Sequence, residues 1–352
     1  MLRPATNPTI RALIVDDTRT IRAMIRALLL RDPRIEVVGE ACDPYEAREM
    51  IRSLNPDVIT LDVVMPKMDG ISFLERLMRL RPMPVVMVSS RTTENSSAAI
   101  QALSLGAFDC VDIAALSRGQ SNVELAEVVV AAASSNPRGQ ATQRRPQSRI
   151  PEQRLNWNGR IVVIGSSTGG VDALTTVLSG FPKDCPPTLI AQHMPPDFLN
   201  NFCARLDRTM APKVGLAKDG AKLEQGRVVF APGGDWHLAL SECPERQMTL
   251  VPNDGSELYV PSVNVLFSSA VYHAPKIVAV MLTGMGKDGA EPMLKLRKAG
   301  AYTIAQDGPS AVVDGMPRAA RDIGAAIEVA SLNNIAAAVL AQVAKPKQEK
   351  TG

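Results

Sequence analysis

The sequence lacks the long hydrophobic run that a membrane-spanning helix requires. A span of the bilayer needs about 20 mostly apolar residues, and the chain holds no uninterrupted apolar run of even about 18 residues. Its first residues also lack the apolar core of a secretory signal peptide. We therefore expect a cytoplasmic protein with no direct membrane insertion.

Cysteine and histidine are both scarce. The five cysteines are odd in number, scattered, and never spaced as Cys-x-x-Cys, which indicates reduced thiols rather than disulfides or a zinc site. They are Cys42, Cys110, Cys185, Cys203 and Cys243. The three histidines are His193, His237 and His273. A reaction that needs an imidazole therefore has few candidate bases.

A strong excess of one charge is also missing. The 39 basic and 36 acidic residues leave a net charge of +3, which is too small to indicate nucleic-acid binding. What the chain does have is length and apolar content. With 352 residues, 45% of them hydrophobic, it can bury two separate cores, so we expect two domains.

The first domain, residues 1–133, alternates strand-like and helix-like segments. Such alternation predicts βαβ units and a doubly wound parallel sheet, hence an α/β fold. The segments are Ala12–Val15, Ile21–Leu30, Ile35–Val38, Tyr45–Leu54, Val58–Leu61, Ile71–Leu80, Val85–Val88, Ser97–Leu105 and Phe108–Val111.

Acidic and hydroxyl side chains follow the predicted strands at the edge where such a sheet places its site. Asp16 and Asp17 follow the first strand, Asp62 the third and Ser89 the fourth. Converging carboxylates repel one another, and a hard cation such as Mg²⁺ relieves that repulsion. A carboxylate beside Mg²⁺ can also attack phosphoryl groups. The alternative is a set of solvated strand-end acids.

The segments Val15–Thr18, Leu61–Gly70 and Val88–Ser90 resemble the receiver domain of two-component response regulators. The resemblance implies a flavodoxin-like fold, with Asp62 as phosphoacceptor, Asp16 and Asp17 as the Mg²⁺ site and Ser89 as the switch hydroxyl. It also implies a histidine kinase as phosphodonor.

One part departs from the receiver pattern. Receivers usually carry an aromatic residue and, three positions later, a lysine, where this chain has Cys110 and Ile113. Isoleucine cannot give the charge-assisted hydrogen bond that a lysine gives to a phosphoaspartate. We expect a receiver that accepts phosphate at Asp62 but responds to it weakly.

Residues 134–156 change composition to Ser, Asn, Pro, Gln and Gly, with five arginines against one glutamate. No apolar periodicity survives, which predicts a flexible basic linker. A basic contact with an acidic partner is the alternative.

The second domain, residues 157–346, opens with an apolar strand from Ile161 to Ile164 that runs into Gly165-Ser166-Ser167-Thr168-Gly169-Gly170. The spacing Gly-x-Ser-x-Gly fits a nucleophile elbow. Phosphate binding or a simple turn are the alternatives for a glycine-rich strand-to-helix turn.

Three candidate catalytic residues follow predicted parallel strands of this domain: Ser167, His193 and Asp288. A serine hydroxyl needs an imidazole to take its proton, and a carboxylate fixes the tautomer of that imidazole. His237 is a rival base. The shorter strands Arg227–Phe230, His237–Leu240 and Met248–Val251 suggest an antiparallel hairpin insertion.

Six blocks of the second domain, in order, resemble the chemotaxis protein-glutamate methylesterase family. They are Gly165–Gly170, Gln192–Pro195, Ala231–Gly234, Pro261–Phe267, Leu282–Ala290 and Gly315–Ala320. The resemblance implies a Rossmann-like domain that hydrolyses glutamate γ-methyl esters on chemoreceptors and deamidates receptor glutamines, with no cofactor for the esterase.

The family motif carries over as Ser167 nucleophile, His193 base and Asp288 orienting group, with Thr168 and the Met285 backbone at the oxyanion or substrate position. Ser166 stands where the family often has alanine, so the nucleophile is ambiguous by one residue, and the Thr-Gly-Gly that follows favours Ser167.

The combination predicts an esterase whose catalytic cleft the receiver covers until Asp62 is phosphorylated. Two other possibilities stay open. One is a non-catalytic receptor-binding or scaffold module in a two-component pathway, and the other is an enzyme that acts mainly as an amidase on glutamine.

Overall fold

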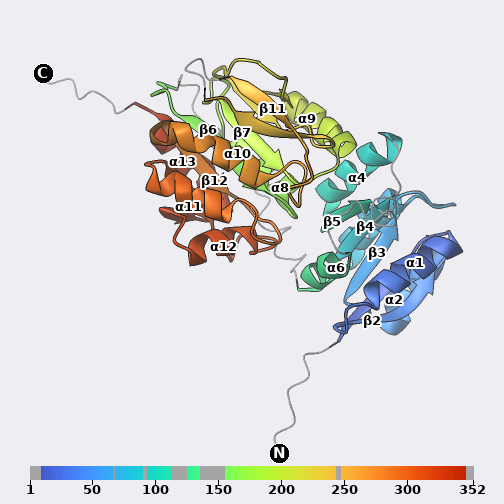
Figure 1. The fold of residues 1–352 in the computed structure, drawn as a ribbon. Helices are drawn as coiled ribbons and strands as arrows, with labels where there is room; N and C mark the ends of the chain where they lie inside the picture. The colour runs from blue at the N-terminus through green and yellow to red at the C-terminus, as the bar shows by residue number, and fades with distance from the viewer. Residues whose placement is uncertain are drawn as a thin grey trace, which may run out of the picture. The chain divides into compact units, whose positions relative to one another are not determined.

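The computed structural model describes residues 9–66, 68–89, 93–112, 125–134, 155–242 and 247–345. The chain divides into two compact units, Met1–Arg145 and Pro146–Gly352 (Figure 1). Ile113 and most of the predicted linker lie outside the described residues. No helix in the described ranges is long and apolar enough to cross a bilayer.

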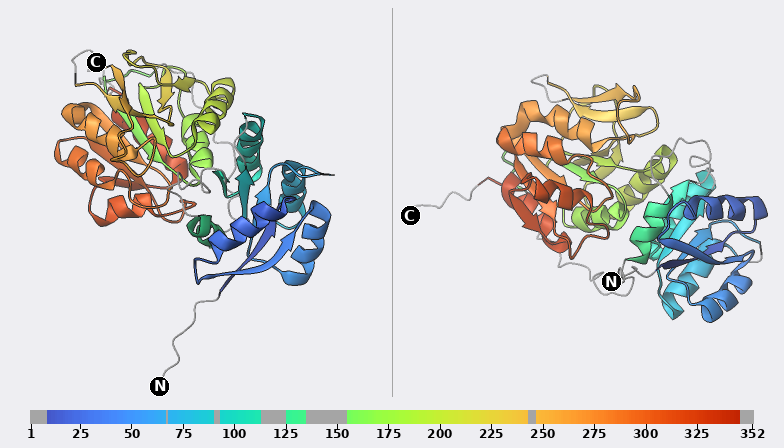
Figure 2. Two further views of the ribbon diagram at one scale, coloured as in Figure 1. Left: turned by 45° about the vertical axis from the view of Figure 1, so that its right-hand side comes forward. Right: turned by 60° about the horizontal axis from the view of Figure 1, so that its bottom comes forward.

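The first unit is a five-stranded parallel sheet in the order β2-β1-β3-β4-β5, covered by helices on both faces (Figure 2). Helix α1 packs beside α6, and α3 beside α4. The strands are β1 (Ile10–Val15), β2 (Ile35–Ala41), β3 (Val58–Asp62), β4 (Val85–Ser89) and β5 (Asp109–Asp112). The helices are α1 (Arg19–Leu29), α2 (Pro44–Leu54), α3 (Gly70–Leu80), α4 (Thr93–Leu105) and α6 (Leu125–Ala133).

Local sequence explains where α2 and α3 begin. Asp43 caps α2 by accepting the N–H groups of Tyr45 and Glu46, and Asp69 caps α3 by accepting that of Ser72. Carboxylates at these positions pair N–H groups that a helix leaves without partners. Both helices then bury an apolar stripe against the sheet, which fixes the strand ends that precede them.

The second unit has a seven-stranded parallel sheet in the order β14-β13-β12-β6-β7-β9-β8 and a separate two-stranded hairpin. The sheet strands are β6 (Ile161–Ser166), β7 (Thr188–Gln192), β8 (Lys213–Leu216), β9 (Arg227–Phe230), β12 (Ile277–Met281), β13 (Tyr302–Gln306) and β14 (Glu328–Ala330). The antiparallel hairpin is β10 (Trp236–Leu240) and β11 (Met248–Pro252).

Helices pack on both faces of this sheet. They are α8 (Gly170–Ser179), α9 (Pro196–Thr209), α10 (Val263–Ala270), a 3₁₀ helix η1 (Val271–Lys276), α11 (Ala290–Lys298), α12 (Met316–Asp322) and α13 (Leu332–Val343). Helices α10 and α11 pack together, as do α8 and α13. The central strands β6, β7 and β12 are fully buried, because helices cover both faces of a parallel sheet.

The order of the strands places a switch point in this sheet. From β6 the chain goes on to β7 at one side, whereas β12 pairs with β6 from the other side. In open α/β sheets, ligands bind beyond the carboxyl ends of the strands at such a point. The loops that follow β6, β7 and β12 therefore meet where a site is expected.

The predicted fold class is confirmed, and one detail of it is corrected. Arg227–Phe230 does not belong to the hairpin: it forms β9, which pairs in parallel with both β7 and β8. Ser262 caps helix α10, so its first helical residue is Val263 and Pro261 lies before it. The four cysteines that the structure describes form no disulfide: Cys42, Cys110, Cys185 and Cys203.

Candidate active site

Ser167 lies directly after strand β6, in the turn that leads into α8. Its N–H donates to the carbonyl of Thr283 at 3.0 Å, and its own carbonyl accepts the N–H of Gly170 at 2.7 Å. The loop after β12 comes so close that a Cβ on Gly284 would lie 2.8 Å from the Ser167 Cβ. The backbone of Gly284 therefore packs directly against the Ser167 side chain. This contact is possible only because residue 284 has no side chain.

The three predicted catalytic side chains form one hydrogen-bonded relay. The Ser167 Oγ is 3.2 Å from His193 Nδ1, and His193 Nε2 is 2.7 Å from Asp288 Oδ2. The His193 and Asp288 side chains are 5% and 3% exposed. An ionised carboxylate only accepts, so Nε2 carries the proton and the Nδ1 lone pair faces the serine hydroxyl. This is the tautomer that a general base for serine requires.

Asp288 is held by the start of helix α10. Its two oxygens accept the N–H groups of Val263 at 2.7 Å and Asn264 at 3.0 Å, and the Ser262 hydroxyl at 3.3 Å. Burial raises the pKa of the Asp288 carboxyl, but the hydrogen bond and charge of His193 and the two backbone N–H groups outweigh it, so the pKa lies below its usual value. Asp288 is therefore ionised at neutral pH.

Gln192 ties the backbones of the serine and histidine together. Its side-chain amide donates to the carbonyls of Ser167 at 2.9 Å and His193 at 3.0 Å, and its oxygen accepts the hydroxyl of Ser166 at 2.6 Å. Ser166 is fully buried and its hydroxyl is committed to this contact. Of the two adjacent serines, only Ser167 contacts the imidazole.

Tyr259 covers the face of the His193 ring. The two rings are stacked with their centroids 4.2 Å apart and their planes 13° from parallel. Burial raises the pKa of the Tyr259 phenol, so it is a neutral hydroxyl at neutral pH. Sequence reasoning missed Tyr259 because the residue belongs to none of the glycine-rich strand ends, and no local pattern marks a ring stack between distant loops.

His237, the rival base, supports the turn that holds Asp288. It is buried, and its Nδ1 accepts the N–H of Ser262 at 3.0 Å. Burial lowers the pKa of His237, in agreement with a neutral ring that accepts a hydrogen bond. The geometry thus makes His237 part of the support of the carboxylate.

Thr168 and Met285 flank Ser167 from two turns. Thr168 is buried, and its carbonyl accepts the hydroxyl of Thr283 at 2.9 Å. Within the described chain, the N–H groups of Thr168 and Met285 have no hydrogen-bond acceptor. Unpaired N–H groups beside a nucleophile are what an oxyanion hole consists of.

The first unit carries the predicted acidic cluster. Ligand oxygens of Asp16, Asp17 and Asp62 lie within 4.8 Å of one another. Burial, together with the neighbouring carboxylates, raises the pKa of Asp16 to about 6 and that of Asp62 to about 7. Three oxygen donors that repel one another fit a hard divalent cation such as Mg²⁺. Ser89 ends strand β4, and its side chain is outside the part of the structure described.

The first unit has a receiver sheet with a clustered acidic site, and the second is an α/β unit with a buried serine–histidine–aspartate relay. Together these features define a response regulator whose output is a serine hydrolase. The family described as CheB methylesterase matches residues 162–339, and the response regulator receiver domain matches residues 12–112. The chain belongs to the CheB methylesterase family.

Named relatives extend the match over nearly the whole chain. The "protein-glutamate methylesterase/protein-glutamine glutaminase 1" of Caulobacter vibrioides is 51% identical over 338 residues, covering 94% of this chain and 97% of that protein. An enzyme of the same class from Agrobacterium fabrum is 46% identical over 336 residues, covering 94% of this chain and 95% of its own. The solved CheB methylesterase catalytic domain of Thermotoga maritima is 36% identical with a TM-score of 0.51, and matches 53% of this chain and all of that domain.

Proposed function

We propose that this protein hydrolyses glutamate γ-methyl esters on chemoreceptors and deamidates receptor glutamines, with Ser167, His193 and Asp288 as its catalytic residues. The observation that carries the assignment is the relay itself, with the Ser167 hydroxyl 3.2 Å from Nδ1 of a His193 ring whose Nε2 is hydrogen-bonded to Asp288 at 2.7 Å. The enzyme names of relatives that match nearly the full chain favour catalysis over the non-catalytic scaffold.

The reaction follows from these positions. His193 Nδ1 takes the proton of the Ser167 hydroxyl while Oγ attacks the ester carbonyl, and Asp288 stabilises the imidazolium that forms. The N–H groups of Thr168 and Met285 would stabilise the oxyanion, each such donor being worth roughly 3–4 kcal/mol of barrier. His193 then protonates the leaving methoxide, and methanol departs from an acyl-enzyme. Water repeats the attack with His193 as base, which releases glutamate and restores the serine.

Deamidation of glutamine needs the same steps with ammonia as the leaving group, so one site serves both reactions. An amide is the poorer electrophile and its nitrogen must be protonated before it leaves. Ammonia release compared with methanol release, from receptor peptides that differ only in Gln or methyl-Glu, decides whether the protein is mainly an esterase or an amidase.

The receiver unit supplies regulation, with Asp62 as phosphoacceptor, Ser89 as switch hydroxyl and a histidine kinase as phosphodonor. Asp16 and Asp17, with Asp62, would hold Mg²⁺, which when bound neutralises charge around the phosphoryl group. The proposed domains are the receiver at 1–133, the linker at 134–156 and the catalytic domain at 157–346, and the proposed location is the cytoplasm.

The test is methanol release from a methylated receptor, with and without a small-molecule phosphodonor. We expect Ser167→Ala to lower the rate at least roughly 10³-fold, and Asp62→Ala to keep basal release but lose any response to the phosphodonor. Ser179→Ala, a serine exposed at the end of α8, is the matched control. Undiminished release by Ser167→Ala would contradict the assignment.

A further inference from the structure

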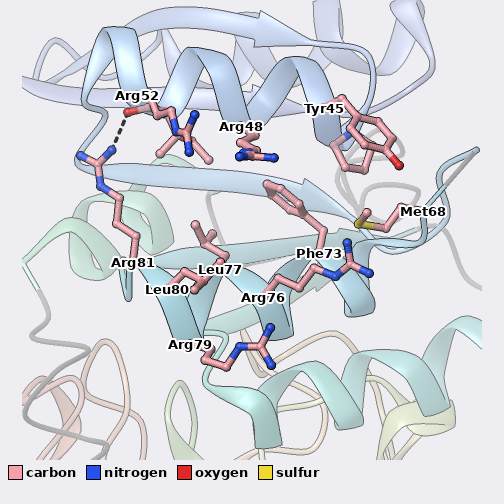
Figure 3. A pocket seen from close by; sticks show the side chains of 12 residues that line it. Tyr45, Arg48, Arg52, Met68, Phe73, Arg76, Leu77, Arg79, Leu80 and Arg81 are labelled. Atoms are coloured by element: carbon pink, nitrogen blue, oxygen red, sulfur yellow. Dashed lines mark hydrogen bonds between the residues drawn. The ribbon is translucent and has the colours of Figure 1, made fainter.

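An apolar groove of about 640 Å³ lies between helices α2 and α3 of the receiver unit. Its floor is apolar: Ile51, Phe73 and Leu77 are buried there, whereas Leu80 is 77% exposed and Tyr45 is 53% exposed. Figure 3 shows Phe73, Leu77 and Leu80 along the groove, with Tyr45 and Met68 near one end and Arg81 at the other. Large apolar side chains left open in a concave surface indicate a binding surface.

Arginines surround this apolar floor. Among the residues that the structure describes, five arginines and no acidic side chain line the groove: Arg48, Arg52, Arg76, Arg79 and Arg81. In Figure 3 the guanidinium groups of Arg48 and Arg52 extend from α2, and those of Arg76 and Arg79 from α3.

Most of this positive charge is not neutralised within the unit. Arg81 is occupied, because it donates to the carbonyl of Ile51 and the side chain of Asn55. Arg52 has only an exposed contact with Glu49 at 3.8 Å, a kind of pair that contributes little. Across the described ranges, Arg48, Arg76 and Arg79 have no side-chain hydrogen bond or ion pair.

The terminal and linker segments of this chain do not match the groove in charge. Residues 1–8 carry one arginine and no acidic residue, residues 134–156 carry five arginines and one glutamate, and residues 345–352 carry three lysines and one glutamate. Like charges would oppose the docking of each of these segments. The occupant that complements the groove is therefore an acidic segment of another molecule.

We propose that the α2–α3 groove binds an acidic segment of a partner protein. One or two large apolar side chains of the segment lie on the floor formed by Phe73, Leu77 and Leu80, and its carboxylates pair with the arginines at both walls. Helix α2 has 11 residues, so the groove accommodates about three turns of a partner helix. The apolar floor favours a polypeptide over a flat anionic membrane, and over nucleic acid, which would need more than the one exposed aromatic ring to stack upon.

The probe is a fluorescein-labelled peptide of about 14 residues, rich in glutamate, with two leucines and a phenylalanine at helical spacing. Its binding to the full-length protein is measured by fluorescence anisotropy. We expect saturable binding that weakens with added salt, about five- to tenfold weaker binding for Arg48→Glu and for Arg76→Glu, and about threefold weaker binding for Leu80→Ser. Arg31→Glu, an exposed arginine outside the groove, should bind like the unchanged protein.

Several results would overturn the proposal. They are an absence of saturable binding, an equal loss in Arg31→Glu and Arg48→Glu, and equal binding of a peptide with glutamine in place of every glutamate. Arginine-dependent binding of phosphatidylglycerol vesicles or of single-stranded DNA, when the peptide does not bind, would assign the groove to another class of partner. Circular dichroism of each variant, together with the milder Arg48→Gln, separates lost binding from lost folding.

Discussion

His237 shows how one residue, distant from the chemistry in sequence, is built into the site. Its Nδ1 must stay unprotonated to accept the Ser262 N–H, and Ser262 begins the turn whose next two N–H groups hold Asp288. Protonation of His237 would turn Nδ1 from an acceptor into an N–H donor. That N–H would then face the N–H of Ser262, and the hydrogen bond between them would be lost. The neutral ring therefore contributes to the position of the Asp288 carboxylate.

The lowered pKa of His237 predicts a pH dependence of stability. The unfolded chain takes up a proton near pH 6.5 while the folded chain resists it, so the stabilisation is complete above pH 6.5 and is lost as the pH falls through the folded pKa. We expect the free energy of unfolding of the second unit to fall below pH 6.5, and to fall less steeply in His237→Gln. The measurement is urea unfolding by tryptophan fluorescence, since Trp157 and Trp236 are the only two tryptophans and both lie in that unit.

His273→Gln is the matched control, because this histidine donates its Nε2–H to the carbonyl of Ser241 and, in the part of the chain that the structure describes, has no hydrogen bond to the turn that holds Asp288. An identical pH slope in the His237→Gln variant and the unchanged protein would show that His237 is not the titrating group.

At the scale of an element, the loop between β12 and α11 both supplies Asp288 and packs against Ser167. A Cβ on Gly284 would lie 2.8 Å from the Ser167 Cβ and 2.3 Å from the Met316 sulfur. Real Cβ atoms do not approach neighbours this closely, so a methyl group at residue 284 must push this loop and Ser167 apart.

We expect Gly284→Ala to lower the rate of methanol release by roughly 10²-fold, since a displacement near 1 Å costs that much, and to destabilise the second unit by about 1–3 kcal/mol. Gly215→Ala on strand β8 is the control, because a Cβ there meets nothing within 4 Å. Activity and urea unfolding are measured on the same preparations. Full activity in Gly284→Ala would mean that the close packing does not position Ser167.

The elements also show what sequence can and cannot predict. Apolar strands such as β6 and β12 are clear from local pattern, and a parallel sheet then brings their following residues, Ser167 and Asp288, to one edge. Strand β8 (Lys213–Leu216) is short and partly exposed, and the partners of β9 are set by distant strands, so local pattern misassigned β9 and missed β8. Likewise, the roles of Gln192 and Tyr259 depend on loops that only the folded chain brings together.

At the scale of the whole molecule, each unit carries its own site and its own core. The acidic cluster destabilises the receiver unit when its carboxyls are ionised, because burial and mutual repulsion raise the pKa of Asp62 to about 7. Because folding raises the pKa of Asp62, ionisation of this carboxyl lowers the free energy of unfolding. The loss begins as the pH rises above the pKa of the unfolded chain and is complete above pH 7.

We expect Mg²⁺ to stabilise the receiver unit at pH 8 by about 1.4 kcal/mol at ten times its dissociation constant. Asp62→Asn should stabilise the metal-free unit and reduce the response to Mg²⁺. Differential scanning calorimetry of the full chain, with Ca²⁺-free buffers and Asp57→Asn as the control, measures both effects. Equal Mg²⁺ responses in Asp62→Asn and Asp57→Asn would refute the metal assignment.

The orientation of the His193 ring has a further consequence. The nitrogen that faces Ser167 is Nδ1, which is only two bonds from Cβ, whereas Nε2 is three bonds away. Because Nδ1 is so close to Cβ, rotation of the His193 side chain moves this nitrogen only slightly. Side-chain rotation therefore changes the distance between Nδ1 and the Ser167 hydroxyl very little. That distance is set instead by the spacing of two main chains, and a single amide, Gln192, clamps both of them.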